Sequence, residues 1–247
     1  MSAIDSVVRW RARVAAGYPV TMINPVVTAP SLVEFMGKLG FDSIMIDCEQ
    51  GSADMERVEE MARAAKLGGM CAIARVQSPA PWMVERTMFR GVQGIVVPRL
   101  DSVADAKEVL DNVQYCFPKS YRDKIVIVQV ETLGMVADLD RVLQMDGIDA
   151  YFIGPVDLAK AMGHKGDYSQ PEVMQAMEDI AKRVRAAGKA VGSMVTPDDA
   201  AYWVARGVNV LYAHATDMLG VAAAMFLKAA NLGDRAVDPE SLRIWAA

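Results

Sequence analysis

Carboxylates and one arginine stand directly after short apolar runs of this sequence. Asp47 and Glu49 follow one such run, Arg75 follows the next, and Glu131 and Asp157 follow two later runs. A positioned arginine can stabilise negative charge that develops on a carbonyl oxygen. A buried carboxylate is costly unless it is paired or binds a metal. If one surface carries all of these groups, it suits acid–base or metal-assisted chemistry on a small oxygen-rich molecule.

The later carboxylates form the candidate metal site. Gln129 and Glu131 are two residues apart on an expected strand, so they share a face, while Val130 points the other way. Asp157 follows a Gly-Pro turn that is expected to open a short helix. Hard divalent cations such as Mg²⁺ or Mn²⁺ favour oxygen ligands of this kind. The alternative is that Glu131 and Asp157 pair with Arg75 in a structural network.

The same turn is a candidate binding site for a substrate carboxylate. Its residues are Gly154, Pro155, Val156 and Asp157. Free backbone N–H groups at a helix N-terminus attract anions. Pro155 has no N–H group, so its neighbours would have to supply the donors. Arg75 is the candidate group for polarising the substrate's carbonyl oxygen.

Several other chemistries are excluded by residues that the sequence lacks. It has only two histidines, His164 and His214, so sites with three histidines and the H-E-x-x-H motif are impossible. No G-x-S-x-G nucleophile motif is present. No expected strand ends in lysine, which a Schiff-base aldolase needs at its catalytic rim. Any carbonyl chemistry is therefore expected to use a metal rather than an imine.

The elements that must position these groups are short apolar runs separated by amphipathic segments. The candidate strands are 20–23, 43–46, 71–74, 94–97, 125–130, 150–153, 190–194 and 208–212. Eight βα units in about 230 residues match the size of a (β/α)8 TIM barrel, an α/β fold with its active site at the carboxyl ends of the strands. The rival, a doubly wound open sheet, usually has a Gly-rich turn after its first strand. Here residues 24–27 contain no glycine.

Composition sets the broad class. Of the 247 residues, 53% are hydrophobic and 23% are charged, which indicates a globular chain, and the net charge of −5 argues against nucleic-acid binding. No apolar run reaches the roughly 20 residues of a membrane span. The three cysteines form no C-x-x-C pair, which favours a cytoplasmic protein with reduced thiols. We expect one domain over residues 1–247, with a peripheral tail at 233–247.

The last expected strand and its neighbours carry other polar residues. His214 is the one histidine that falls at the same rim, where a local hydrogen-bonding role is expected. Ser193, Thr216 and Asp217 lie where barrels often hold phosphate. No paired glycines support a phosphate site, and a helix cap is the expected role of Thr216 or Asp217.

Taken together, these motifs resemble the HpcH/HpaI aldolase family, the class II pyruvate aldolases related to the citrate lyase β subunit. The similarity covers about residues 17–230. The stretches that carry it are 40–42, 46–49, Arg75, 94–98, 129–132, 152–158 and 162–164. The resemblance implies a TIM barrel of the phosphoenolpyruvate/pyruvate-domain type. It also implies a homo-oligomer, a hexamer or trimer, in which a C-terminal helix is exchanged between subunits.

The resemblance further implies an activity and a role for each residue. Family members cleave 4-hydroxy-2-oxo acids reversibly into pyruvate and an aldehyde, and some decarboxylate oxaloacetate. Glu131 and Asp157 would bind a divalent cation (Mg²⁺, Mn²⁺ or Co²⁺), with Gln129 supporting the site. Arg75 would contact the keto oxygen, and Asp47 would belong to the acid–base apparatus. The cation would chelate the 2-oxo acid and stabilise the enolate formed when the C3–C4 bond breaks.

Two departures from the family pattern leave alternatives open. The family motif Asp-x-Glu-His ends here in Gln50, which can hydrogen-bond but cannot titrate near neutral pH. The connection around residues 117–120 is also shorter than in many relatives, which bears on the aldehyde partner. The main alternative is an oxaloacetate-type decarboxylase, which needs no base for a hydroxyl proton. A citrate-lyase-like enzyme acting on acyl-coenzyme A esters is a third option, but this sequence shows no basic patch for the coenzyme A phosphates. A non-catalytic 2-oxo acid binder is the remaining alternative.

Overall fold

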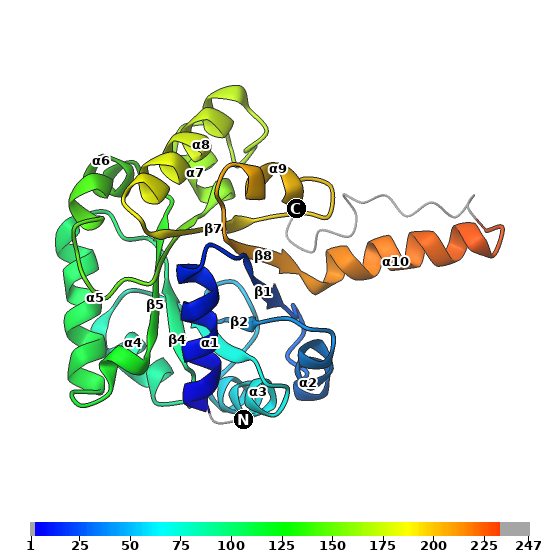
Figure 1. Ribbon diagram of the computed structural model, residues 1–247, viewed down its shortest axis with the longest axis horizontal. Coiled ribbons are helices and arrows are strands. Elements are labelled where there is room, and N and C mark those ends of the chain that lie inside the picture. Colours follow the sequence, from blue (N-terminus) through cyan, green and yellow to red (C-terminus); the bar gives the residue numbers. More distant parts are fainter. Residues whose placement is uncertain (1–2, 233–247) are drawn as a thin grey trace.

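A closed barrel of parallel strands forms the centre of the molecule. The computed structural model describes residues 3–232, and in it eight strands follow one another in chain order, with the last strand paired to the first (Figure 1). The strands are β1 Val20–Asn24, β2 Ser43–Asp47, β3 Cys71–Arg75, β4 Gly94–Val97, β5 Ile125–Val130, β6 Ala150–Ile153, β7 Ala190–Met194 and β8 Val210–His214. The predicted (β/α)8 barrel is therefore confirmed.

Helices follow the strands and surround most of the barrel. They are α1 Ala3–Ala15, α2 Pro30–Lys38, α3 Met55–Leu67, α4 Pro81–Met88, α5 Val103–Cys116, α6 Leu133–Val142, α7 Pro155–Ala161, α8 Pro171–Ala186, α9 Ala200–Ala205 and α10 Ala215–Ala229, with a 3-10 turn at Tyr121–Asp123. Asp54, Ser102 and Thr132 cap α3, α5 and α6 by accepting bonds from backbone N–H groups. Four other helices (α2, α4, α7 and α8) begin with proline, whose missing N–H costs nothing there.

Alternation along each strand divides the core into an inner and an outer layer. In β5, Ile125 and Ile127 pack inside the barrel, whereas Val126 and Val128 pack against the surrounding helices. This burial on both faces explains why the strands are continuous apolar runs. Trp10 of α1 joins the inner cluster, so α1 closes the amino end of the barrel. The polar groups are thereby left at the carboxyl end.

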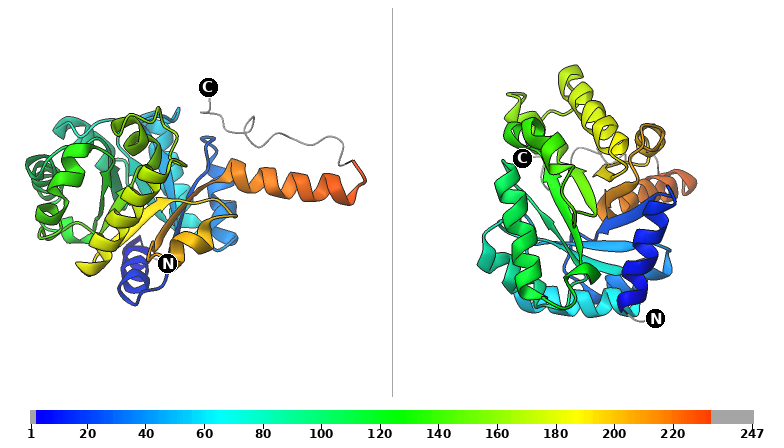
Figure 2. Two further views of the ribbon diagram at one scale, coloured as in Figure 1. Left: turned by 90° about the horizontal axis from the view of Figure 1, so that it is seen from above. Right: turned by 60° about the vertical axis from the view of Figure 1, so that its left-hand side comes forward.

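The last helix behaves differently from the others. In Figure 1 and in the left view of Figure 2, α10 extends away from the barrel, and none of its residues is buried. No helix of the described residues 3–232 is long and apolar enough to cross a lipid bilayer.

The sequence-based boundaries differ from the structure mainly at the carboxyl ends of strands. β1, β2 and β3 each run one residue further than predicted, and β8 covers Val210–His214 rather than 208–212. The additional residues are the polar ones of the rim, which pair in register although they are not apolar. The predicted single domain over 1–247 stays a prediction, and the tail at 233–247 lies outside the described residues.

Candidate active site

Arg75 is held between two carboxylates at the carboxyl rim of the barrel. Its Nε donates to Asp47 Oδ1 at 2.9 Å and its Nη2 donates to Oδ2 at 2.6 Å. Its Nη1 lies 3.2 Å from Glu49 Oε2. The three side chains are only 13%, 9% and 5% exposed for Arg75, Asp47 and Glu49. A guanidinium has five N–H donors, so two remain for a ligand.

Both members of the Arg75–Asp47 pair are ionised. Burial alone would raise the pKa of Asp47, but the bonds and charge of Arg75, with the backbone N–H groups of Gln50 and Glu49, lower it below the usual value. Burial would likewise lower the pKa of Arg75, but Asp47 raises it strongly. The pair is therefore an ion pair without net charge, and what Arg75 offers to the mouth of the barrel is its remaining N–H donors. Arg75 does not pair with Glu131 or Asp157, so the predicted structural alternative for those carboxylates is wrong.

Glu131 directly follows β5, which is separated from β3 by one strand, and it is only 3% exposed. Its Oε2 accepts a bond from Gln129 Nε2 at 2.6 Å, which confirms that the two side chains share a face. Its Oε1 accepts a bond from the backbone N–H of Arg99 at 2.7 Å. The carboxylate is thus fixed by two donors, although no basic side chain is bonded to it.

The charge of Glu131 is strongly disfavoured in the absence of a cation. Burial raises the pKa of Glu131 to about 7; the Arg99 N–H opposes this shift, and the nearby charges of Asp157 and Glu49 add to it. Asp157 lies in the first turn of α7, where its Oδ1 is 3.1 Å from Lys160 Nζ. Carboxylates that repel one another across a buried space favour a cation between them.

Gly154 keeps that space open. A β-carbon at this position would lie 2.3 Å from Glu131 Oε2 and 3.3 Å from Gln129 Nε2. Only a residue without a side chain therefore fits between the turn before α7 and the Glu131 carboxylate. The glycine also stands at the N-cap position of the short helix that the sequence predicted after the Gly-Pro turn.

These residues fit a divalent cation of the Mg²⁺ type. Glu131 and Asp157 offer carboxylate oxygens, and the buried Oε1 of Gln129 has no hydrogen-bond partner. Among residues 3–232, no group of three or more histidine, cysteine or acidic side chains forms a complete metal cage. Mg²⁺ usually takes only one or two protein carboxylates and keeps water or substrate oxygens in its other positions. A two-carboxylate site of this kind matches that preference.

Arg99 is a site residue that the sequence analysis missed. Its Nε donates to Glu49 Oε1 at 2.8 Å while its backbone N–H binds Glu131, so it links the two carboxylates. Its φ of 59° lies in the left-handed region, which is costly for a residue with a side chain and is concentrated at functional sites. The available signal was a basic residue directly after Pro98, at the end of the fourth predicted strand.

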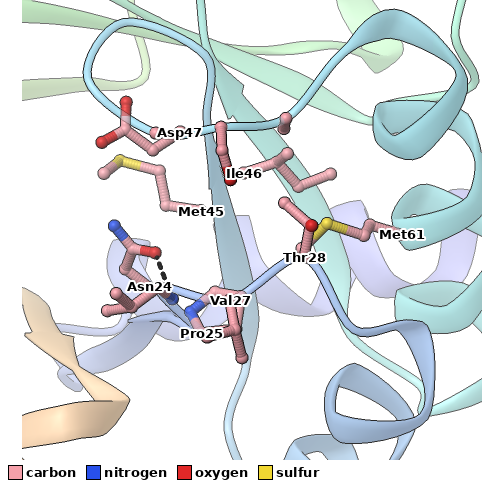
Figure 3. A pocket seen from close by; sticks show the side chains of 12 residues that line it. Asn24, Pro25, Val27, Thr28, Met45, Ile46, Asp47 and Met61 are labelled. Atoms are coloured by element: carbon pink, nitrogen blue, oxygen red, sulfur yellow. Dashed lines mark hydrogen bonds between the residues drawn. The ribbon is translucent and has the colours of Figure 1, made fainter.

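A pocket opens beside Asp47, between the ends of β1 and β2 (Figure 3). Asn24, Met45 and Asp47 line part of it. The Asn24 Oδ1 accepts a bond from the backbone N–H of Val26 at 2.8 Å, drawn as a dashed line. Val26 has a φ of 65°, which is an outlier for a β-branched residue. The side-chain bond from Asn24 holds this turn in place.

The structure places the other predicted residues around this mouth. Gln50 is exposed, and its backbone N–H donates to Asp47 Oδ1 at 3.3 Å. Pro155 and Val156 form the first turn of α7. Thr216 and Asp217 are not caps, because α10 begins at Ala215 with His214 at the N-cap position. Because β8 runs to His214 and α10 starts directly after it, Thr216 and Asp217 fall inside the first turn of α10.

Comparison with known proteins gives one consistent family. The profile described as HpcH/HpaI aldolase/citrate lyase matches residues 25–223. A hydroxypyruvate/pyruvate aldolase from Pseudomonas aeruginosa is 32% identical over 66% of this chain and 69% of its own length. A protein of the same name from Roseovarius nubinhibens is 29% identical over 68% of this chain and 75% of its own. A 5-keto-4-deoxy-D-glucarate aldolase from an Enterobacter species is 27% identical over 66% and 73%.

Solved structures match the fold over most of the chain. An HpcH/HpaI aldolase/citrate lyase family protein from Burkholderia cenocepacia superposes with a TM-score of 0.82 at 23% identity, covering 90% of this chain and 99% of that one. An HpcH/HpaI aldolase from Desulfitobacterium hafniense gives a TM-score of 0.76 at 21% identity, covering 89% and 95%. At these identities the likeness concerns the barrel itself.

Proposed function

This chain belongs to the HpcH/HpaI aldolase/citrate lyase family, and on that premise we propose that it cleaves a 4-hydroxy-2-oxo acid into pyruvate and an aldehyde with the help of a divalent cation. An aldolase-type lyase is what the named relatives support. The 2-oxo acid substrate, the cation and the residue roles are the further steps of the proposal.

One observation carries the proposal: the buried Arg75, the buried Glu131 and the partly exposed Asp157 lie at the same barrel mouth. Arg75 contributes two unused N–H donors, and its charge acts on Glu131. A 2-oxo acid offers a carboxylate and a keto oxygen on adjacent carbons. Such a ligand needs a cation for its two oxygens and a hydrogen-bond donor for the charge that develops on the keto oxygen.

A divalent cation held by Glu131 and Asp157 would supply Lewis-acid stabilisation of the enolate charge. The chain's own residues do the rest. Arg75 donates to the keto oxygen from a position fixed by Asp47. Gly154 leaves room for the ligand next to Glu131, and the backbone N–H groups of the first turn of α7 favour its carboxylate.

The pocket beside Asp47 accommodates the remainder of the substrate in this proposal. It lies next to Asp47, to which the family resemblance gives an acid–base role, so the carbon beyond C3 would extend towards β1 and β2. Cleavage breaks the C3–C4 bond, leaves its electron pair in the pyruvate enolate and forms the carbonyl group of the aldehyde. A proton must then reach C3.

Metal removal and a single substitution test the proposal. A chelator is expected to abolish pyruvate and aldehyde release from 4-hydroxy-2-oxo acids, and added Mg²⁺, Mn²⁺ or Co²⁺ is expected to restore it. Glu131→Ala is expected to stay inactive at every cation concentration. The control Glu172→Ala, which removes an exposed carboxylate at the start of α8, is expected to behave as the wild type. Full activity of Glu131→Ala would refute the proposal.

Gln50 favours a second candidate, decarboxylation of an oxaloacetate-type acid through the same enolate. Its side chain is exposed and cannot take a proton from a hydroxyl group. Carbon dioxide release removes no hydroxyl proton, so it needs no base at this position.

Comparing carbon dioxide release with aldehyde release over a substrate panel separates the two candidate reactions. A Gln50→His variant that gains aldehyde release would favour decarboxylation as the native activity. Binding of pyruvate and Mg²⁺ without any turnover would leave only a 2-oxo acid binder.

A further inference from the structure

A line of hydrogen-bonded side chains occupies the part of the barrel mouth formed by β8 and β1. The Tyr212 hydroxyl accepts a bond from Asn24 Nδ2 at 2.8 Å and lies 2.9 Å from His214 Nε2. His214 Nδ1 lies 3.7 Å from Asp217 Oδ2, in the first turn of α10. The four residues come from β1, β8 and α10, and the predicted site includes none of them.

The donors in this line fix its direction. Asn24 Nδ2 can only donate, so the Tyr212 oxygen accepts from it and its own proton is free to point at His214 Nε2. His214 then carries its proton on Nδ1, on the side of Asp217. A hydroxyl, an imidazole and a carboxylate in this order are the arrangement by which proteins move a proton from an oxygen to a histidine and stabilise the imidazolium that results.

The line is next to the groups of the candidate site. Tyr212 belongs to the inner barrel cluster, and its ring packs edge-on against Phe152 with 5.6 Å between centroids. The charges of Arg75 and Asp47 both act on Tyr212 and on His214. With Asp217, these are the charged groups that face His214 from β2, β3 and α10. Burial, the largest effect, lowers the pKa of His214, so its imidazole is neutral and can accept a proton near pH 7.

We propose that Tyr212, His214 and Asp217 form the proton-transfer apparatus of this enzyme, with Tyr212 touching the 2-oxo acid and His214 and Asp217 acting through it. The inference rests on the proposed cleavage function and supplies what Gln50 cannot. The C4 hydroxyl proton passes to the Tyr212 oxygen as the Tyr212 proton passes to His214 Nε2. The C3–C4 bond breaks, its electrons enter the enolate, and the C4 oxygen forms the carbonyl. The proton then returns by the same route to C3.

Two reactions of the same enzyme separate this role from a structural one. Cleavage of a 4-hydroxy-2-oxo acid needs the hydroxyl proton to be removed, whereas carbon dioxide release from oxaloacetate does not. We expect Tyr212→Phe and His214→Gln to lower kcat for cleavage by about 100-fold or more. Carbon dioxide release should stay within about 3-fold of the wild type.

Matched controls make the same chemical changes elsewhere. Tyr202→Phe removes a hydroxyl that contacts Glu178 on the outside of the barrel, and His164→Gln changes the only other histidine. Both are expected to retain both reactions. In His214→Gln, a second change of Gln50→His is expected to recover part of the lost cleavage, because it returns a titrating group to the same mouth.

A binding measurement tests the contact without turnover. The chain has two histidines, so the His164→Gln variant assigns their imidazole NMR signals. Pyruvate with Mg²⁺ is expected to shift the His214 signals and to leave those of His164 unchanged. Unshifted His214 signals in a protein that pyruvate stabilises against heat would overturn the proposal.

The remaining outcomes are also decisive. Wild-type cleavage with unchanged cleavage in Tyr212→Phe and His214→Gln refutes the proton route and leaves the proposed function standing. Equal loss of both reactions shows a structural role and refutes the route as well. A wild type that cleaves no 4-hydroxy-2-oxo acid and does not bind pyruvate with Mg²⁺ refutes the proposed function, and the proton route falls with it.

Discussion

The proposed role of Arg75 depends on the shape of its guanidinium group as well as on its charge. Two of its donors engage both oxygens of Asp47, and a third faces Glu49. A lysine keeps the charge but cannot form this fork. Arg75→Lys is therefore expected to lower kcat/KM for cleavage by about 100-fold, the cost of losing one donor to a developing oxyanion. Steady-state kinetics measure the effect.

A matched change tests whether this loss belongs to the site. Arg63 pairs with Glu59 on the exposed surface of α3, so Arg63→Lys should retain wild-type kinetics. The role given to Arg75 would be wrong if Arg75→Lys kept wild-type kcat/KM.

Glu131 makes the stability of the metal-free protein depend on pH. Its pKa is about 7 in the folded chain, against 4.5 for the ordinary carboxyl, so the folded state binds a proton that the unfolded state has already lost. This contribution is fully present below pH 4.5 and is lost as pH rises through about 7. A shift of this size corresponds to about 3 kcal/mol. We expect Mg²⁺ to raise Tm more at pH 8 than at pH 5.5, because cation binding needs the ionised carboxylate.

The Glu131→Gln variant isolates this effect. The lowered pKa of His214 gives stability the opposite slope, since a neutral buried histidine destabilises the fold only as pH falls below 6.5. Subtracting the Tm profile of Glu131→Gln from that of the wild type removes the histidine contribution. A difference that does not change between pH 4.5 and pH 8 would contradict the assignment.

At the level of elements, the turn between β6 and α7 determines the space next to Glu131. In Gly154→Ala the new methyl group would lie 2.3 Å from Glu131 Oε2 and would push the carboxylate away from its donors. We expect the protein to fold, with a stability loss of about 1–3 kcal/mol, and Mg²⁺ affinity to fall by at least about 10-fold. Isothermal titration with Mg²⁺ measures this.

Another closely packed glycine provides the control. A β-carbon at Gly68, at the end of α3, would lie 3.2 Å from the Glu34 carbonyl oxygen, far from the candidate site. Gly68→Ala should therefore lower stability and leave Mg²⁺ affinity unchanged. Equal Mg²⁺ affinity in Gly154→Ala and the wild type would show that the turn does not shape the cation site.

The regular elements were predictable because they follow local patterns. Burial on both faces makes each strand a continuous apolar run, and a glycine or proline marks most boundaries. The shared face of Gln129 and Glu131 follows from a spacing of two on one strand, and their hydrogen bond confirms it. Residues contributed by one strand are therefore within reach of sequence reasoning.

Contacts between distant strands were not predictable in the same way. Arg99 binds Glu131 through its backbone N–H, which any residue type has, so the basic side chain after Pro98 was a weak signal for this contact. Tyr212 lies in an apolar run and is 188 residues from its partner Asn24. The link from His214 to Asp217 depends on where α10 begins, which is set by the length of β8. Register and helix start are tertiary properties that periodicity does not contain.

For the whole molecule, α10 is the α-helix of the described residues 3–232 with no buried residue. Four of its large apolar side chains are between 46% and 71% exposed: Leu219, Val221, Met225 and Phe226. Monomeric proteins rarely expose an apolar helix of this kind, and such surfaces mark interfaces. Figure 1 and the left view of Figure 2 show the helix extending away from the barrel, and it is its beginning, at Ala215 and Met218, that packs against the core.

We propose that a second copy of this chain covers α10. A helix that is apolar on all sides needs a partner with its own apolar surface, and a copy of α10 or of the barrel beside it supplies one with the same composition. Burial of each of these side chains would contribute about 1.5–3 kcal/mol. Light scattering coupled to size-exclusion chromatography is expected to give a mass of at least two chains. A double change of Leu219→Glu and Phe226→Glu should then give a folded monomer.

The decisive comparison uses an exposed leucine on another helix. Leu67, at the end of α3, is 77% exposed, so Leu67→Glu makes the same kind of substitution on a helix other than α10. That variant should keep the wild-type mass because Leu67 is not part of the proposed α10 interface. If the wild type elutes as a monomer, or the α10 double variant keeps the oligomeric mass, another explanation for the exposed helix is required. A monomer that retains wild-type cleavage would further show that assembly and the active site are independent, although α10 begins immediately after His214.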